Sequence, residues 1–190
     1  MGPAAASLLV YTTCGIWVIG DLSLILHDRR RSDASTDRGS LRLVLLAVLA
    51  AAAIGYAASY LHVMRLPGSR ASQMLVGTGL MWVGMLFRWW AILTLGRFFS
   101  AVVSIKRDHQ LIRSGPYAQL RHPAYTGSLV SFLGLGVALG SWVAVVSMPI
   151  VLFLGFRSRM TREEEALIDA FGQDYRDYMR ETKRLIPGIY

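Results

Sequence analysis

The chain has 190 residues, of which 54% are hydrophobic and only 17% are charged. Soluble domains average roughly 25% charged residues, so this deficit argues against a soluble protein and for a membrane protein. The net charge of +8 does not indicate a nucleic-acid partner, because the cations cluster in the gaps between apolar runs, as a bilayer requires. A single cysteine, Cys14, excludes an intramolecular disulfide. Four histidines without HxxxH or HExxH spacing argue against a metal site.

Four apolar regions follow one another, at about residues 4–26, 41–64, 73–95 and 124–156. A helix needs ~20 residues to cross the hydrocarbon core, so the first three regions each fit one crossing. The first has no preceding cation and is too long for a typical cleavable signal peptide, so it is interpreted as a membrane helix.

The fourth apolar region is too long for one crossing. Gly140-Ser141, near its centre, predicts a tight turn between two helices at about residues 124–139 and 142–156. We therefore expect an all-α, polytopic integral membrane protein: a single domain over residues 1–190 with about five transmembrane helices.

The cations are distributed unevenly along the connections. Arginines are dense after the first helix, in the loop at residues 96–123 and in the segment at residues 157–190, and sparse elsewhere. Five crossings place all the cation-rich segments on one side of the membrane, whereas four crossings would divide them. The positive-inside rule then predicts an outside N-terminus, with the loop and the C-terminal helix and tail in the cytoplasm. The Ala- and Arg-rich composition suggests a prokaryotic cell membrane.

Arg88 is the unusual residue of the third apolar region, because a cation inside the membrane is costly. It is expected either to reach the interface beside Trp89 and Trp90 or to face a polar cavity, where it could contact the headgroup of a substrate. The glycine patterns at 77/79/84 and 134/136/140 resemble nucleotide fingerprints, but no strand precedes them. They therefore predict close helix packing.

The polar run from His109 to Gly127, HQLIRSGPYAQLRHPAYTG, combines cations, histidines, tyrosines and prolines between two apolar regions. Such an inventory is typical of a binding or catalytic site, although a Gly-Pro turn before a proline-started helix explains part of it structurally.

The segment from Arg157 to Arg180 has the apolar periodicity of an amphipathic helix. Its stripe places Glu163 and Glu164 toward the protein body and turns Glu165 toward solvent. These carboxylates could instead complement the helix dipole, or Glu163 could pair with Arg159. Gly172 predicts a break or a C-cap.

The two motifs together, HxLxxxGxYxxxRHPxYxG from His109 and RxxxEExxLxxxFGxxYxxY from Arg159, resemble the isoprenylcysteine carboxyl methyltransferase family. Phospholipid N-methyltransferase relatives share much of the pattern. The resemblance covers roughly residues 95–190 and implies a membrane methyltransferase that uses S-adenosylmethionine, with S-adenosylhomocysteine as product. It implies a cytoplasmic cofactor pocket formed by the central loop and the C-terminal helix.

Motif positions imply the roles of individual residues. Arg159 matches the arginine that family members place near the reacting carboxylate, and is the expected catalytic residue. Arg121 lies in the motif without a role beyond the structure of the loop. The expected cofactor-binding residues are His109, Leu111, Tyr117, His122, Pro123, Tyr125, Glu163 and Glu164.

The chemistry of these side chains agrees with those roles. Carboxylates can accept hydrogen bonds from an ammonium group or ribose hydroxyls, and tyrosines can pack on adenine. A carboxylic acid is ionised at neutral pH and needs no general base, whereas an amine acceptor must lose a proton. The expected partners are a lipid-like acceptor and the bilayer, with no nucleic acid and no metal.

Three alternatives to carboxyl O-methylation stay open: N-methylation of a phospholipid amine, an NADPH-dependent oxidoreductase resembling sterol reductases, and a non-catalytic scaffold. Glu163 and Glu164 argue against the oxidoreductase, because a nucleotide phosphate prefers cations. The sequence does not name the methyl acceptor.

Overall fold

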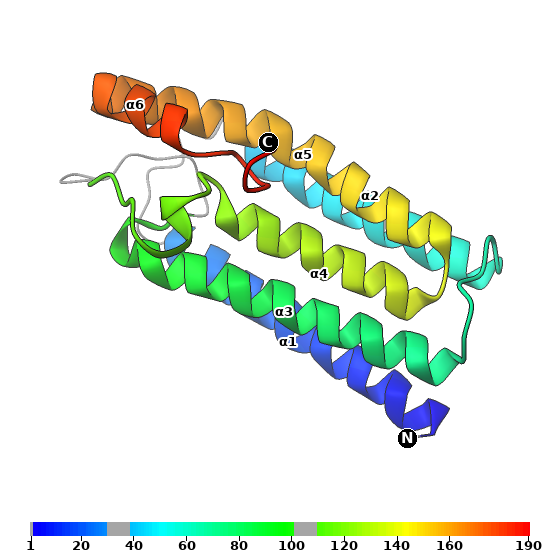
Figure 1. The fold of residues 1–190 in the computed structure, drawn as a ribbon. Helices are drawn as coiled ribbons and strands as arrows, with labels where there is room; N and C mark the ends of the chain where they lie inside the picture. Colours follow the sequence, from blue (N-terminus) through cyan, green and yellow to red (C-terminus); the bar gives the residue numbers. More distant parts are fainter. Residues whose placement is uncertain (1, 30–38, 101–109) are drawn as a thin grey trace.

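The computed structural model describes residues 2–29, 39–100 and 110–190, and its regular elements are helices. Five long helices lie side by side in a bundle, and a short sixth helix caps one end of it (Figure 1). The elements are α1 (Pro3–Arg29), α2 (Ser40–Tyr60), α3 (Arg70–Leu95), α4 (Pro123–Leu139), α5 (Trp142–Phe171) and α6 (Gln173–Glu181), with short 3-10 turns η2 (Gly96–Phe98) and η3 (Gly115–Ala118).

The outer surface of the bundle is apolar. Large side chains such as Leu46, Leu93, Ile150 and Leu154 are exposed there, as expected where lipid replaces water. Helices α1, α2, α3 and α5 are long and apolar enough to cross a membrane, whereas α4 is apolar but has 17 residues. The expected count of five crossings therefore stays a prediction, because α4 is close to the lower limit of ~17 residues for one crossing.

The turn between α4 and α5 lies where the sequence places it. Gly140 has a φ of 73°, and its N–H donates to the carbonyl oxygens of Gly136 and Val137. This left-handed conformation favours glycine and ends α4 one residue earlier. After Ser141, α5 runs back alongside α4 (Figure 1).

Helix α5 differs from the expected division into a span at 142–156 and a separate helix after it. It continues without interruption to Phe171, a length of ~45 Å. Good helix formers such as Arg159, Met160 and Glu163 follow the apolar part, so nothing stops the helix at the membrane surface. It ends at Gly172, which has a φ of 57° and separates α5 from α6. The helix break expected at this glycine is therefore present.

Glycines bring α3 and α4 into backbone contact. A Cβ at Gly84 would lie 2.5 Å from the Gly127 carbonyl oxygen, and a Cβ at Gly134 would lie 2.6 Å from the Met81 nitrogen. Only hydrogen fits at these positions, so the glycine patterns are packing sites, as expected. Gly79 is an exception, since a Cβ there would meet nothing within 4 Å.

Gly84→Ala is expected to destabilise the protein by about 1–3 kcal/mol, because the added methyl group forces α3 and α4 apart. Gly79→Ala on the same helix is the matched control, and is expected to be neutral or slightly stabilising. Thermal unfolding in detergent measures both variants. Equal stabilities for the two would show that the close α3–α4 contact does not form.

The central loop and the C-terminal segment meet at one end of the bundle. The N–H of Arg121 donates to the Lys183 carbonyl oxygen at 2.7 Å, and the N–H of His122 donates to that of Arg184 at 3.0 Å. These bonds join the start of α4 to the chain that follows α6, at one end of the bundle (Figure 1).

Candidate functional site

A cavity of about 520 Å³ opens at the end of the bundle where the loop and the C-terminal segment meet. This size is within the range of ~300–1,000 Å³ that is typical of small-molecule sites. Its walls combine apolar side chains of α1 and α2, such as Leu22 and Leu45, with polar and aromatic side chains of the motif segments. One end of the cavity is therefore apolar and the other end is polar.

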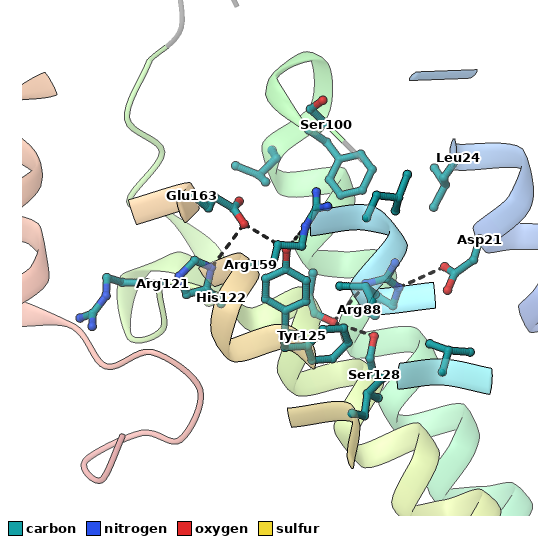
Figure 2. Close-up of a pocket in the computed structure, with 18 of the residues that line it drawn as sticks. Asp21, Leu24, Arg88, Ser100, Arg121, His122, Tyr125, Ser128, Arg159 and Glu163 are labelled. Atoms are coloured by element: carbon teal, nitrogen blue, oxygen red, sulfur yellow. Dashed lines mark hydrogen bonds and ion pairs between the residues drawn. The ribbon is translucent and has the colours of Figure 1, made fainter. Parts of the chain in front are cut away.

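A chain of hydrogen bonds forms the polar wall. The hydroxyl of Tyr125, on α4, donates to Oε2 of Glu163 at 3.0 Å and accepts from Nε of Arg159 at 2.7 Å. Arg159 and Glu163 come from successive turns of α5, so one face of that helix supplies a cation and an anion to the cavity (Figure 2). Arg159 is 4% exposed, so its charge lies in a largely dry environment.

Behind this wall, Glu164 holds the loop and the C-terminal segment together. Its carboxylate accepts from Nε of Arg121 at 2.8 Å, from Nε of Arg184 at 3.0 Å and lies 3.2 Å from Nε2 of His122. We call these four residues, Arg121, His122, Glu164 and Arg184, the clamp. The Glu164 side chain is 3% exposed, and its hydrogen bonds raise the pKa of Arg184 above the usual value. The clamp thus joins three segments that are distant in sequence.

Tyrosines close the cavity toward η3 and α6. Tyr117, Tyr175 and Tyr178 are buried and line it. The Tyr178 hydroxyl donates to the Tyr117 carbonyl oxygen at 2.7 Å, and burial raises the pKa of Tyr178 to about 12. Burial likewise raises the pKa of Tyr175 and Tyr117. These phenols are therefore neutral at physiological pH and offer flat apolar surfaces to a ligand.

Arg88 points into the bundle at the deeper part of the cavity rather than outward to the interface. Its Nε donates to Oδ1 of Asp21 on α1 at 3.1 Å, and its Nη1 donates to the Ala124 carbonyl oxygen at 3.3 Å (Figure 2). Of the two expected positions for this cation, the structure supports the polar cavity. Asp21 explains how a guanidinium is tolerated there.

The structure gathers most of the expected site residues around one cavity. Seven of them line it: Arg88, Leu111, Tyr117, His122, Tyr125, Arg159 and Glu163. Two do not line it: Pro123 occupies the first turn of α4, and Glu164 binds the other residues of the clamp. His109 lies outside the described residues. Glu165 is exposed, as the helical stripe predicts.

Three residues of the site have no functional role that the sequence predicts. The motif assigns Arg121 only to the structure of the loop, although its place beside His122 is a usable signal. Arg184 follows α6 among other tail cations and carries no distinguishing pattern. Asp21 could have been found as the single carboxylate inside the first apolar region, where a charge demands a partner.

Comparisons with other proteins show which family the chain resembles. Residues 76–169 match the isoprenylcysteine carboxyl methyltransferase family, and this segment contains most of the polar wall. The chain is similar to the protein-S-isoprenylcysteine O-methyltransferase of Schizosaccharomyces pombe, with 36% identity over 113 residues, which cover 58% of this chain and 48% of the relative. It is similar to protein-S-isoprenylcysteine O-methyltransferase B of Arabidopsis thaliana, with 31% identity over 109 residues, covering 56% of this chain and 55% of that one.

The fold has a solved counterpart. The structure of a eukaryotic intramembrane Ras methyltransferase, isoprenylcysteine carboxyl methyltransferase, superposes with a TM-score of 0.61 at 25% identity, covering 76% of this chain and 52% of that one. The chain spans about half the length of the relatives it matches. These relatives are eukaryotic, so they give no support to a prokaryotic source. The chain is an all-α integral membrane protein. Through residues 76–169, about half of its length, it is similar to the isoprenylcysteine carboxyl methyltransferase family.

Proposed function

We propose that the protein is a membrane methyltransferase that uses S-adenosylmethionine to O-methylate the carboxylate of a lipophilic acceptor such as an S-isoprenylated cysteine. The observation that carries the proposal is a cavity that has Arg159 and Glu163 at its polar end and aliphatic side chains of α1 and α2 at the other. The match to the isoprenylcysteine carboxyl methyltransferase family supports it, since the relatives are named for this reaction.

The residues present fit such a methyl donor. Glu163 can accept hydrogen bonds from an ammonium group or ribose hydroxyls, and the neutral rings of Tyr117 and Tyr125 can pack on an adenine. Leu111 and His122 line the same region. A bound sulfonium donor supplies an electrophilic methyl group. Glu164 and Pro123 would then act indirectly, by holding the loop and starting α4.

Arg159 has the position needed to hold the acceptor. A guanidinium offers paired N–H donors to a carboxylate, and the hydrogen bond from Nε to Tyr125 fixes its plane. The acceptor carboxylate is already ionised at neutral pH, so no base has to remove a proton. What the site contributes is alignment of the carboxylate and exclusion of water. Arg88, paired with Asp21, is a second cation that an acceptor headgroup could meet.

The acceptor's tail has a route from the lipid. Leu22 of α1 and Leu45 of α2 line the cavity and are also exposed on the apolar surface. Within the described part of the chain, α1 packs mainly on α3 and α2 mainly on α5, so the two helices leave room between them. A prenyl chain entering there would reach Arg159 with its headgroup. By the positive-inside rule, the cation-rich segments favour a cytoplasmic position for this end of the bundle.

Methyl transfer from labelled S-adenosylmethionine to an S-farnesylated N-acetylcysteine is the direct test. We expect a product whose label is released as methanol by mild base, because carboxyl methyl esters hydrolyse there and N-methyl groups do not. A base-stable label on phosphatidylethanolamine would instead support N-methylation, which shares the same cofactor residues. No transfer to either acceptor would leave the proposal without support.

A further inference from the structure

Glu164 of the clamp does more than hold the three segments together, because it also contacts the ring of His122 beside the cavity. The side chain of His122 is 3% exposed, and its Nε2 lies 3.2 Å from Oε1 of Glu164. Its Nδ1 lies 3.9 Å from Oε2 of Glu163, and Figure 2 shows these two side chains side by side. We infer that Glu164 is a positioning residue: it accepts the Nε2 proton of a neutral His122 and so keeps Nδ1 as an unprotonated acceptor beside Glu163 at the cavity wall.

Glu164 can only accept hydrogen bonds. Nε of Arg121 and Nε of Arg184 both donate to it, and two cationic donors strongly favour the ionised carboxylate. An ionised carboxylate has no proton to give, so the contact with His122 needs the proton on Nε2. The choice of which ring nitrogen is protonated thus follows from the partner of the other one, as at many catalytic histidines.

The second nitrogen is left unprotonated by its surroundings. The charged groups from the packed segments are Arg121 and Arg184 of the clamp, with Arg159, Glu163 and Glu164 from α5. The ring itself contacts the two carboxylates, Arg121 and Arg184 bind Glu164, and Arg159 binds the neighbouring Tyr125. Three cations therefore offset two carboxylates around the ring, and a further positive charge on a buried ring would be unfavourable. Nδ1 lies 3.9 Å from Oε2 of Glu163, which is longer than a hydrogen bond, so this contact does not require a proton on Nδ1.

Nδ1 of His122 and the carboxylate of Glu163 are therefore two neighbouring hydrogen-bond acceptors, and neither carries a proton. Nδ1 of His122 and Oε2 of Glu163 lie 3.9 Å apart, and both residues line the cavity. A group rich in N–H donors satisfies both, and the ammonium or amine of the methyl donor has that chemistry. This last step rests on the proposed function, whereas the protonation pattern does not.

The protonation pattern is read by nitrogen NMR on protein labelled at the histidine ring nitrogens, in detergent at pH 7.5 without cofactor, with a His122→Asn sample to identify the signal. We expect one protonated and one unprotonated nitrogen, with the coupling pattern that assigns the proton to Nε2. A proton on Nδ1, or on both nitrogens, would overturn the inference. This result stands whether or not the protein binds S-adenosylhomocysteine.

Two replacements of His122 test which nitrogen the ligand uses. The amide of asparagine reaches the position of Nδ1, and that of glutamine reaches the position of Nε2. His122→Asn is therefore expected to bind S-adenosylhomocysteine at least about tenfold more tightly than His122→Gln, the effect of about one charge-assisted hydrogen bond. Equal binding, or tighter binding by the glutamine variant, would contradict the role of Nδ1.

Glu164→Gln tests the positioning step itself. Glutamine keeps the shape but loses the charge, so we expect a mixture of protonation patterns at His122 and about tenfold weaker S-adenosylhomocysteine binding. Glu165→Gln, the exposed neighbour, is the control and should keep both at the level of the unmodified protein. An unchanged His122 signal in Glu164→Gln would refute the inference. If that variant does not fold, the unmodified protein and the His122 pair decide the question.

Discussion

Arg159→Ala is expected to lower the turnover of a carboxylate acceptor by about 10²–10³-fold while leaving S-adenosylhomocysteine affinity within a factor of about three. The reason is that the Arg159 guanidinium is 4% exposed and would hold the acceptor carboxylate in a dry site, where one such donor matters most. Turnover is measured with a farnesylated cysteine, and cofactor binding is measured by calorimetry on the same preparation.

The control for this prediction lies one half-turn away. Arg157 is exposed on the same helix, so Arg157→Ala removes an equal charge without reaching the cavity. It should leave turnover unchanged within about twofold. If Arg159→Ala abolishes S-adenosylhomocysteine binding as well as turnover, Arg159 holds the cofactor rather than the acceptor, and the proposed assignment of the two ligands fails.

Glu164→Ala is expected to destabilise the protein by about 3–5 kcal/mol, because it leaves two guanidinium groups and an imidazole without their shared anion. Arg121 and Arg184 have side chains that are 10% and 23% exposed, so water replaces the carboxylate poorly. The loss is measured as a shift of thermal unfolding in detergent.

Glu165→Ala provides the comparison, since Glu165 is exposed on the next residue of α5. Its effect should be within ±0.5 kcal/mol, as for most surface substitutions. A similarly small effect for Glu164→Ala would show that the clamp does not hold the loop against the C-terminal segment.

Much of the fold follows from the sequence. Hydrophobic length identifies the helices, and Gly140 and Gly172 mark two helix ends where the left-handed backbone requires glycine. The glycine spacing identifies the contact between α3 and α4, because only backbone approach explains it in an apolar run. The continuity of α5 beyond Phe156 is harder to predict from the sequence. A helix that leaves the membrane changes from apolar to polar residues without having to end there.

The sequence predicts which residues form the site but not which contacts these residues make with one another. The motifs bring His122, Tyr125, Arg159 and Glu163 to one cavity, as expected. They do not reveal that Glu164, adjacent to Glu163, turns to the clamp instead. A rotation of about 100° per residue separates the two carboxylates, and only packing decides which one meets the cavity.

Long-range charge pairs are the part that sequence reasoning misses. Asp21 with Arg88 and Arg184 with Glu164 pair residues on different elements, and no periodicity relates their positions. Each pair is found only when the helices are placed in space. The proposed methyl acceptor is not identified for a similar reason, because an apolar cavity wall is compatible with many hydrophobic chains and does not define a head group.

Binding of S-adenosylhomocysteine against NADPH to the purified protein tests most directly the claim that the central loop and the segment after Phe156 form one pocket for a methyl donor. The account predicts saturable calorimetric binding of S-adenosylhomocysteine, at least about tenfold weaker in Glu163→Gln, and none of NADPH. Saturable binding of NADPH with none of S-adenosylhomocysteine would contradict it and favour an oxidoreductase.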